Sequence, residues 1–300
     1  MAFLLAVLDA AFGQAVRVPG SSVSLVPPDG FLPARQFPGF QRDDLQASIM
    51  VTEMPGPSTA MMEGMTKQSL ARQGLKLIAA RPLAVEGRPA VLLHLGQKVG
   101  PKDYRKWMLV TGDENTTVLV VATFPVGAAP ALSDGLQRSV STVSWRAETA
   151  TDPFEGLLFR ISPSARLKIA RRMSNMVMLT ESGSAGALGP DDALYVVGNS
   201  TSRAAIDDVR TFSESRIAQT AQLSDVRNFT GRHLTVDGLE AYEIVADAKD
   251  RSSGAAMKVY QVVVPDGTVY FIMQGLISAG RAEEGLQEFR RVTESFARAR

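Results

Sequence analysis

Residues 234–244 read LTVDGLEAYEI and residues 83–93 read LAVEGRPAVLL, so Leu, Val, an acidic residue and Gly recur in one order, 151 residues apart. In both stretches apolar and β-branched residues flank an acid–Gly pair, which is typical of two strands joined by a tight turn. A single matching corner has little weight, but further matches at the same spacing would indicate a duplicated domain.

Further matches follow toward the C-terminus. The run Thr117–Val121 corresponds at the same spacing to Thr268–Ile272, and a turn-forming stretch, TGDEN or VPDG, precedes each run. Both copies then contain Gly-Leu-Gln within a helical pattern, and an aromatic residue, Trp145 or Phe296, ends each pattern 151 residues apart. The matches keep one order, and they predict two tandem repeats.

Each repeat is expected to contain a strand, an irregular loop, a strand, a helix, four strands and a final helix. In the first repeat the strands are expected near 22–26, 47–53, 75–85, 89–97, 105–111 and 116–124, and the first helices of the two repeats are expected at 59–73 and 202–219. Four strands joined by short turns form an antiparallel meander, whose apolar face helices must cover. The predicted fold class is α+β, with two tandem repeats that are each an antiparallel β-sheet covered by helices.

The length of 300 residues agrees with two domains. We expect domain 1 at 16–146, a polar linker at 147–156 and domain 2 at 157–300. Residues 1–15 combine an apolar run, Ala2 to Leu8, with small residues that follow it, as in the remnant of a signal peptide. The run is too short to span a bilayer, which takes about 20 apolar residues. This pattern predicts a periplasmic or otherwise exported protein, with a cytoplasmic location as the alternative.

The composition excludes several classes of function. A formal net charge of +1 and an aromatic content of 7% are unlike those of a nucleic-acid-binding protein. The chain has no cysteine, which excludes disulfides, thiolate metal sites, cysteine nucleophiles and a lipid-modified cysteine anchor.

The order of elements, with the opening VSLVPPDGFLPARQFPGF from Val23 and the terminal helix, resembles the PsbP-like superfamily. That superfamily includes the extrinsic protein PsbP of the oxygen-evolving complex, a nuclear Ran-GTPase release factor and exported bacterial proteins. The resemblance implies a sandwich of one antiparallel sheet and helices in each repeat. It implies no shared activity, because a fold does not determine a function, and its best-known members are binding or accessory factors.

No catalytic constellation stands out in the sequence. His94 and His233, the two histidines, occupy non-equivalent positions in the two repeats. Asp207 and Asp208 are adjacent and fit the start of a helix, where negative charge is favoured. We therefore expect a non-catalytic accessory or binding protein without a cofactor, and a hydrolase with an unrecognised site is one alternative.

Partner-binding residues are expected where the repeats differ, in the long stretches 30–44 and 163–190. The partner is expected to be an envelope or membrane-associated protein, with a small ligand as the alternative. Two sets of side chains are candidates, aromatic anchors and basic residues that would contact an anionic partner: Phe31, Phe37 and Phe40, and Lys102, Arg105, Lys106, Arg171 and Arg172.

Methionines provide a further alternative. Met61, Met62 and Met65 are close in sequence within the first expected helix, and Met62 and Met65 are spaced i, i+3. Thioethers bind Cu(I), and a protein without cysteine would need them for that purpose. Methionine is also a flexible core residue, so packing explains the same pattern.

Overall fold

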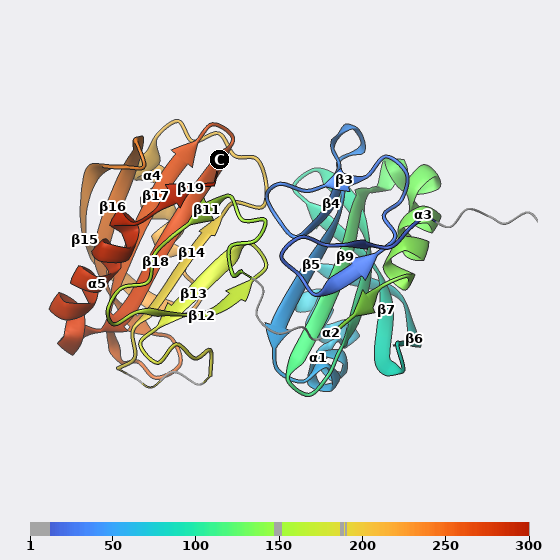
Figure 1. Ribbon diagram of the computed structural model, residues 1–300, viewed down its shortest axis with the longest axis horizontal. Coiled ribbons are helices and arrows are strands. Elements are labelled where there is room, and N and C mark those ends of the chain that lie inside the picture. The colour runs from blue at the N-terminus through green and yellow to red at the C-terminus, as the bar shows by residue number, and fades with distance from the viewer. Residues whose placement is uncertain (1–12, 147–151, 187–188, 190, 300) are drawn as a thin grey trace, which may run out of the picture. The chain divides into compact units, whose positions relative to one another are not determined.

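The computed structural model describes residues 13–146, 152–186, 189 and 191–299. The chain divides into two compact units: unit 1 contains the described residues of 1–34 and 39–148, and unit 2 contains 35–38 and those of 149–300. Figure 1 shows one large sheet with its helices in each unit. None of the described helices is both long and apolar enough to cross a membrane.

In unit 1 a seven-stranded sheet has the order β3-β4-β5-β9-β8-β7-β6, and every neighbouring pair is antiparallel. A small sheet joins β2 to β1 and β10. The elements of unit 1 are β1 (Val16–Arg17), β2 (Val23–Leu25), β3 (Leu32–Pro33), β4 (Gly39–Arg42), η1 (Asp43–Leu45), β5 (Ala47–Pro55), α1 (Ser58–Gly64), α2 (Lys67–Arg72), β6 (Leu75–Val85), β7 (Arg88–Val99), β8 (Lys102–Gly112), β9 (Thr116–Pro125), η2 (Val126–Ala128), α3 (Ala129–Ser141) and β10 (Ser144–Trp145).

Unit 2 repeats this arrangement. Its seven-stranded sheet has the order β12-β13-β14-β18-β17-β16-β15, and β11 pairs with β19 as β2 pairs with β10. Its elements are β11 (Phe159–Arg160), β12 (Lys168–Met173), β13 (Met176–Thr180), β14 (Leu194–Asn199), α4 (Val209–Ala218), β15 (Leu223–Val236), β16 (Leu239–Asp250), β17 (Ala256–Asp266), β18 (Val269–Ser278), η3 (Ala279–Arg281), α5 (Ala282–Glu294) and β19 (Ala297–Arg298). The predicted α+β fold with two tandem sheet-based repeats is confirmed.

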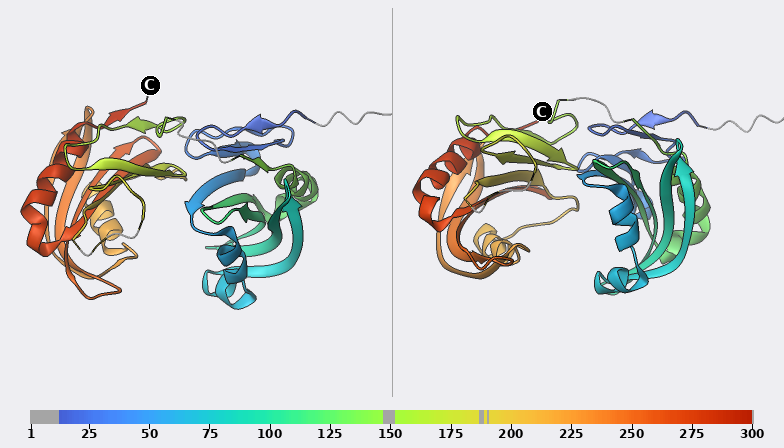
Figure 2. Two further views of the ribbon diagram at one scale, coloured as in Figure 1. Left: turned by 60° about the horizontal axis from the view of Figure 1, so that its bottom comes forward. Right: turned by 90° about the horizontal axis from the view of Figure 1, so that it is seen from below.

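Helices cover both faces of each sheet, and Figure 2 shows α4 and α5 on opposite faces in unit 2. Successive strand residues face opposite sides, so Leu92 packs with α3 in the larger core of unit 1, whereas Leu93 packs with Leu70 of α2. In unit 2 the α5 residue Phe289 belongs to one core and the α4 residue Ile217 to the other. Polar side chains on either face of these sheets can therefore become buried.

The recurring corner is a two-residue hairpin turn in both units. Glu86 and Gly87 have φ values of 49° and 81°, and Asp237 and Gly238 have 47° and 76°. Positive φ at both central residues defines the turn that matches the twist of a hairpin, and glycine adopts it without steric cost. The turn closes the pairs Val85–Arg88 and Val236–Leu239.

The spacing between the repeats is 151 residues only within the β6–β7 hairpin and its counterpart, β15–β16. Beyond it the spacing is 153, because β9 begins at Thr116 and β18 at Val269. The turn between β16 and β17 is longer than that between β7 and β8. At that spacing Leu136 corresponds to Phe289. The matches of Thr117–Val121 to Thr268–Ile272, of the two Gly-Leu-Gln segments and of Trp145 to Phe296 were therefore wrongly aligned.

The stretches expected to be irregular contain β-hairpins. Residues 30–44 include β3 and β4, and the described part of 163–190 includes β12 and β13, each at the corresponding edge of its sheet. The first expected helix, 59–73, is two helices, because Thr66 caps α2 by accepting a hydrogen bond from the Ser69 amide. The helix expected at 202–219 begins at Val209, where Asp208 accepts from the amides of Arg210 and Thr211.

Parts of the predicted boundaries lie outside the described residues. Of the predicted signal-peptide remnant, 1–15, the structure describes Gly13 to Ala15, which are exposed. Of the predicted linker, 147–156, it describes 152–156, where Phe154 packs in the larger core of unit 2. The last residues of that linker are therefore part of unit 2.

Because each unit has its own core, the two units should unfold independently. Phe289 is fully buried and stacks on Tyr195 with ring centroids 5.2 Å apart. Phe289→Ala should lower the unfolding free energy of unit 2 by about 3–5 kcal/mol. Because the two tryptophans, Trp107 and Trp145, lie in unit 1, urea unfolding should start earlier by circular dichroism but not by tryptophan fluorescence.

Leu136→Ala at the corresponding position of α3 is the matched control, and it should move the fluorescence transition instead. A single transition that shifts equally in both signals for both variants would contradict independent cores.

Candidate functional site

The candidate site is a groove of unit 2, formed where β15 and β16 meet α5. It has a volume of about 450 Å³, and three of its lining residues are charged; the lining consists of Thr230, Gly231, Arg232, Glu243, Val245 and Arg290. Arg232 and Glu243 are directly opposite each other on the paired strands, and Arg290 comes from the helix above that face. Strand register and helix packing together bring the three charged residues into one place.

Glu243 is held by both arginines. Its Oε1 accepts from Arg232 Nε at 3.1 Å and from Arg290 Nη2 at 2.9 Å. Its Oε2 accepts from Arg232 Nη2 at 3.2 Å and from Arg290 Nε at 3.3 Å. Two paired N–H donors on a carboxylate form the strong bidentate arrangement. We call Arg232, Glu243 and Arg290 the ionic triad.

The triad is asymmetric in its exposure. The Glu243 side chain is 4% exposed, whereas those of Arg232 and Arg290 are 61% and 38% exposed. Burial acts to raise the pKa of Glu243, but the hydrogen bonds and charges of Arg290 and Arg232 outweigh it, and the pKa lies below the ordinary value of 4.5. Glu243 is therefore an ionised anchor that fixes two guanidinium groups.

A neutral phenol lies behind the anchor. Tyr260 is fully buried, its Oη is 3.0 Å from Thr293 Oγ1 of α5, and burial raises its pKa. Tyr195 Oη is 2.6 Å from the same Thr293 oxygen, and burial raises its pKa as well. Both phenols stay protonated at neutral pH, so Glu243 is the charged group at the base of this groove.

The triad has no counterpart in unit 1. Arg81 and Leu92 are paired opposite each other as Arg232 and Glu243 are, but Leu92 is an apolar core residue. At the 153-residue spacing the place of Arg290 is taken by Gln137 of α3. None of the three triad residues was predicted from the sequence. A signal was present, because the match of LAVEGRPAVLL to LTVDGLEAYEI places Glu243 at the position of an apolar residue, Leu92.

The groove is suited to hold an anion. The bonds to Glu243 use Nε and Nη2 of each arginine, and a guanidinium carries five N–H donors. The Nη1 group of each arginine is not used in these bonds, and the triad as a whole carries one net positive charge. A carboxylate or another planar anion is the chemical group that such paired donors recognise.

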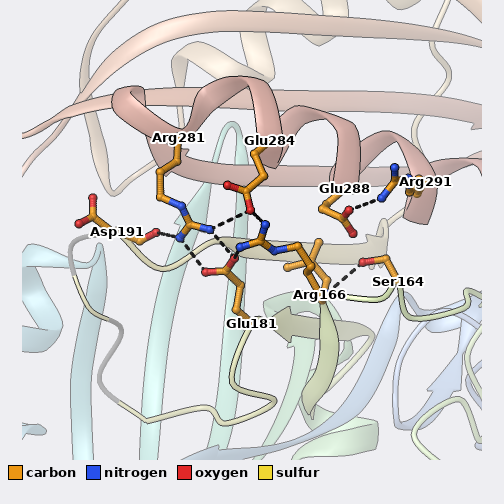
Figure 3. Close-up of polar contacts among 9 residues, drawn as sticks. Ser164, Arg166, Glu181, Asp191, Arg281, Glu284, Glu288 and Arg291 are labelled. Carbon is orange, nitrogen blue, oxygen red and sulfur yellow. Dashed lines mark hydrogen bonds and ion pairs between the residues drawn. The ribbon is translucent and has the colours of Figure 1, made fainter.

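A second charged cluster joins the start of α5 to neighbouring segments (Figure 3). Arg281 donates to both oxygens of Glu181, at 2.9 and 2.7 Å, and to the Asp191 carbonyl at 2.8 Å. Arg166 pairs with both Glu181 and Glu284. The hydrogen bond from Arg281 lowers the pKa of Glu181. Each of these charges is engaged by another, so we assign the cluster to holding α5 against the sheet edge.

The predicted aromatic anchors are not exposed. Phe31 and Phe40 are buried in the larger core of unit 1, and Phe37 is buried as well. The three rings are therefore not exposed anchors: Phe31 and Phe40 pack in the core because β3 and β4 belong to the sheet, and Phe37 lies in the turn between these strands.

The predicted basic residues do not form one patch. Lys102 bonds the Gln46 side chain at 3.1 Å, and Lys106 bonds Thr123 Oγ1 at 2.9 Å, with its pKa lowered by burial. Arg105 and Lys106 are successive strand residues and face opposite sides. Arg172 donates to the main-chain carbonyls of Ser174 and Glu155, whereas Arg171 occupies the bulged part of β12.

The methionines lie at another groove, of about 350 Å³, beside α1. Met61 and Met65 line it with Pro55, Gly64 and Gln73, whereas Met62 is not among its lining residues. Met65 also packs on the apolar cluster around Leu70. The expected pair Met62 and Met65 thus does not line this groove together, whereas Met61 and Met65 both do. No group of three or more His, Asp or Glu residues within the described part of the chain is arranged to hold a metal.

The two histidines lie in different units. His94 stacks on Trp107 with ring centroids 4.2 Å apart, and burial, with a smaller effect of Arg105, lowers its pKa. Its strand position corresponds to that of Val245 in unit 2. His233 Nδ1 is 3.1 Å from Glu240 Oε1 on the exposed side of β15. The structure does not bring the two histidines into a common site.

The topology defines a tandem α+β protein of two seven-stranded antiparallel sheets with helices on their faces. No protein-family model matches the sequence, and none of the curated proteins matches it. The similarity to a PsbP protein that the sequence predicts is found again among solved structures. Cyanobacterial PsbP (CyanoP) from Synechocystis sp. PCC 6803 is 15% identical, with 44% of this chain and 92% of that chain covered and a TM-score of 0.33.

Two other solved structures are similar. LpqN, involved in cell envelope biogenesis of Mycobacterium tuberculosis, is 13% identical, with 47% of this chain and 83% of that chain covered and a TM-score of 0.32. The immunity protein TplEi of the Pseudomonas aeruginosa T6SS is 12% identical, with 97% and 98% covered and a TM-score of 0.36. These likenesses are too distant to transfer a function, so the candidate site rests on the geometry of this chain.

The ionised state of Glu243 has a measurable consequence. Because its folded pKa is lowered, its contribution to stability is fully present above the unfolded pKa and is lost as pH falls through the folded value. Urea titrations between about pH 6 and about pH 3 should therefore show a steeper acid loss of stability for the wild type than for Glu243→Gln.

Glu243→Leu, which introduces the residue found at the unit 1 position, should lose the same part of the pH dependence. Identical slopes for all three proteins would contradict an ionised Glu243 in the folded state.

Proposed function

We propose that this chain is an exported, non-catalytic binding protein whose second unit holds an anionic group of an envelope-associated partner at the ionic triad. The observation that carries the proposal is Glu243 itself, a carboxylate buried at a position where unit 1 has a core leucine. The export component rests on the sequence pattern of residues 2–15.

Stability alone does not account for the triad. Moving charges out of water costs several kcal/mol per ion, and replacing buried ion pairs with apolar residues is often neutral or stabilising. Leu92 demonstrates that the same fold accepts an apolar residue at this position. A buried anchor that orients two partly exposed guanidinium groups is, in contrast, what a preorganised anion-binding site requires.

Binding also fits the triad better than catalysis. A general acid or base needs a pKa near the working pH and access to the reacting proton. Glu243 has a lowered pKa, and both of its oxygens already accept hydrogen bonds from arginine. Arginine does not deprotonate in proteins, so the exposed groups of the triad act as fixed donors.

A displayed library of random peptides tests this proposal even while the partner is unidentified. The wild-type protein should enrich peptides that contain Asp or Glu, and the enrichment should weaken as salt is added. Arg232→Gln with Arg290→Gln should bind the enriched peptides about 10- to 100-fold more weakly, because charge-assisted hydrogen bonds are lost.

Arg81→Gln is the matched control, because Arg81 has the same strand position in unit 1, opposite Leu92. It should bind the peptides as the wild type does. Equal affinity of the double variant and the wild type would contradict the proposed site, and cleavage of an enriched peptide, seen by mass spectrometry, would contradict a non-catalytic role.

A further inference from the structure

The groove borders an open edge of the sheet. β15 is the last strand in the order of the unit 2 sheet. Its pairing with β16 is regular from Thr230 to Val236 and irregular before Thr230, where register shifts follow Ser224 and Arg227. Residues 227–233 are exposed. The regular stretch 230–236 is long enough to pair with another strand, since a typical strand has about 5–6 residues.

The hairpin register identifies which main-chain groups face outward. In a two-residue hairpin the pair that closes the turn, here Val236–Leu239, exchanges hydrogen bonds, and bonded pairs alternate with unbonded ones along the ladder. Gly231, His233 and Thr235 belong to the unbonded pairs. Their N–H and C=O groups therefore point away from β16, toward the free edge.

In unit 1 the edge strand β6 has a proline at the position of His233. Pro82 of β6 pairs with Val91 as His233 pairs with Tyr242. Proline has no N–H and occurs in edge strands with its nitrogen facing outward, where it prevents the addition of another strand. Pro82 agrees with this register, because only an unbonded position tolerates proline. The edge of unit 1 is blocked at this point, whereas that of unit 2 keeps its donor.

The ionic triad lies beside this edge, on the face of the sheet that α5 covers. Arg232 lies between two outward-facing residues of β15, and its side chain reaches the groove under α5. An added strand would place every second side chain on this face, about 5 Å from those of β15. Phe229, 46% exposed, lies just before the regular stretch and offers an apolar contact. Charge complementarity selects a carboxylate as the side chain next to the arginines.

We propose that an extended acidic segment of a protein partner adds to β15 as a further strand, with its backbone bonded to Gly231, His233 and Thr235 and a carboxylate at Arg232 and Arg290. The proposal rests on the proposed function and specifies how the partner is held. Main-chain hydrogen bonds supply the affinity in this mode of recognition, and alternate side chains supply the specificity.

The test uses a synthetic peptide of about eight residues that alternates threonine and glutamate. His233→Pro, which introduces the residue found in unit 1, removes an outward N–H, and His233→Ala is its control because it keeps that N–H. The His233 side chain faces away from Arg232 and pairs with Glu240. Titration calorimetry should give about tenfold weaker binding for His233→Pro and an affinity within about twofold of the wild type for His233→Ala.

Hydrogen exchange in the wild-type protein gives a second measurement that does not depend on the folding of a variant. Peptide binding should slow exchange at the amides of Gly231, His233 and Thr235. Equal affinities of the Pro and Ala variants, or unchanged exchange at these three amides, would overturn strand addition.

Two outcomes separate strand addition from the anion site alone. Loss of binding in the double arginine variant with unchanged binding in His233→Pro would retain the anion site and reject strand addition. Self-association of the wild type that His233→Pro abolishes would identify a second copy as the occupant of the edge, and it would overturn the acidic segment.

Discussion

The register of the β15–β16 hairpin is the constraint on which the site depends. Asp237 and Gly238 adopt positive φ, which fixes a two-residue turn and therefore which residues are opposite each other. A shift by one residue would move every side chain to the other face. It would take Glu243 out of the groove under α5 and turn the His233 N–H inward. The geometry of the ionic triad and the pattern of free groups on the edge follow from one turn.

The two units share this register but differ in the side chains at corresponding positions. Leu92, His94 and Pro82 of unit 1 correspond to Glu243, Val245 and His233 of unit 2. In unit 1 the face under the helix is apolar at Leu92, His94 stacks on Trp107, and proline blocks the edge. Unit 2 has a buried anion with two arginines and an edge that keeps its donor. These three differences lie close together, on one hairpin of each sheet.

Much of the fold could be predicted because it depends on local patterns. The acid–Gly turns and the apolar runs predicted the central strands, with β6 at 75–85 in both the prediction and the structure. The edge hairpins were missed, because two-residue β3 and bulged β12 lack a clear alternation. The spacing of 153 was also missed, because Thr117–Val121 and Thr268–Ile272 are similar by chance at a spacing of 151.

The site was harder to predict, because burial depends on tertiary structure. In β16 the residues Tyr242, Ile244 and Ala246 form an apolar face, so Glu243 and Asp247 on the other face look solvent-exposed. That interpretation holds for a sheet with one covered face, and here α5 covers the second. For the same reason Phe31 and Phe40, which the sequence places in a long loop, are buried beside edge strands that the sequence did not reveal.

In the proposed binding mode the triad and the edge form one site, and the energetic balance supports this combination. A buried carboxylate with a single arginine would leave little positive charge, and two arginines without the carboxylate would repel each other. With Glu243 between them, both guanidinium groups stay fixed and one net positive charge remains at the groove. One charge on a wet surface gives little affinity, because an exposed ion pair contributes at most about 1 kcal/mol. Main-chain hydrogen bonds along β15 would supply the remaining affinity, and the triad would then determine which segment is accepted.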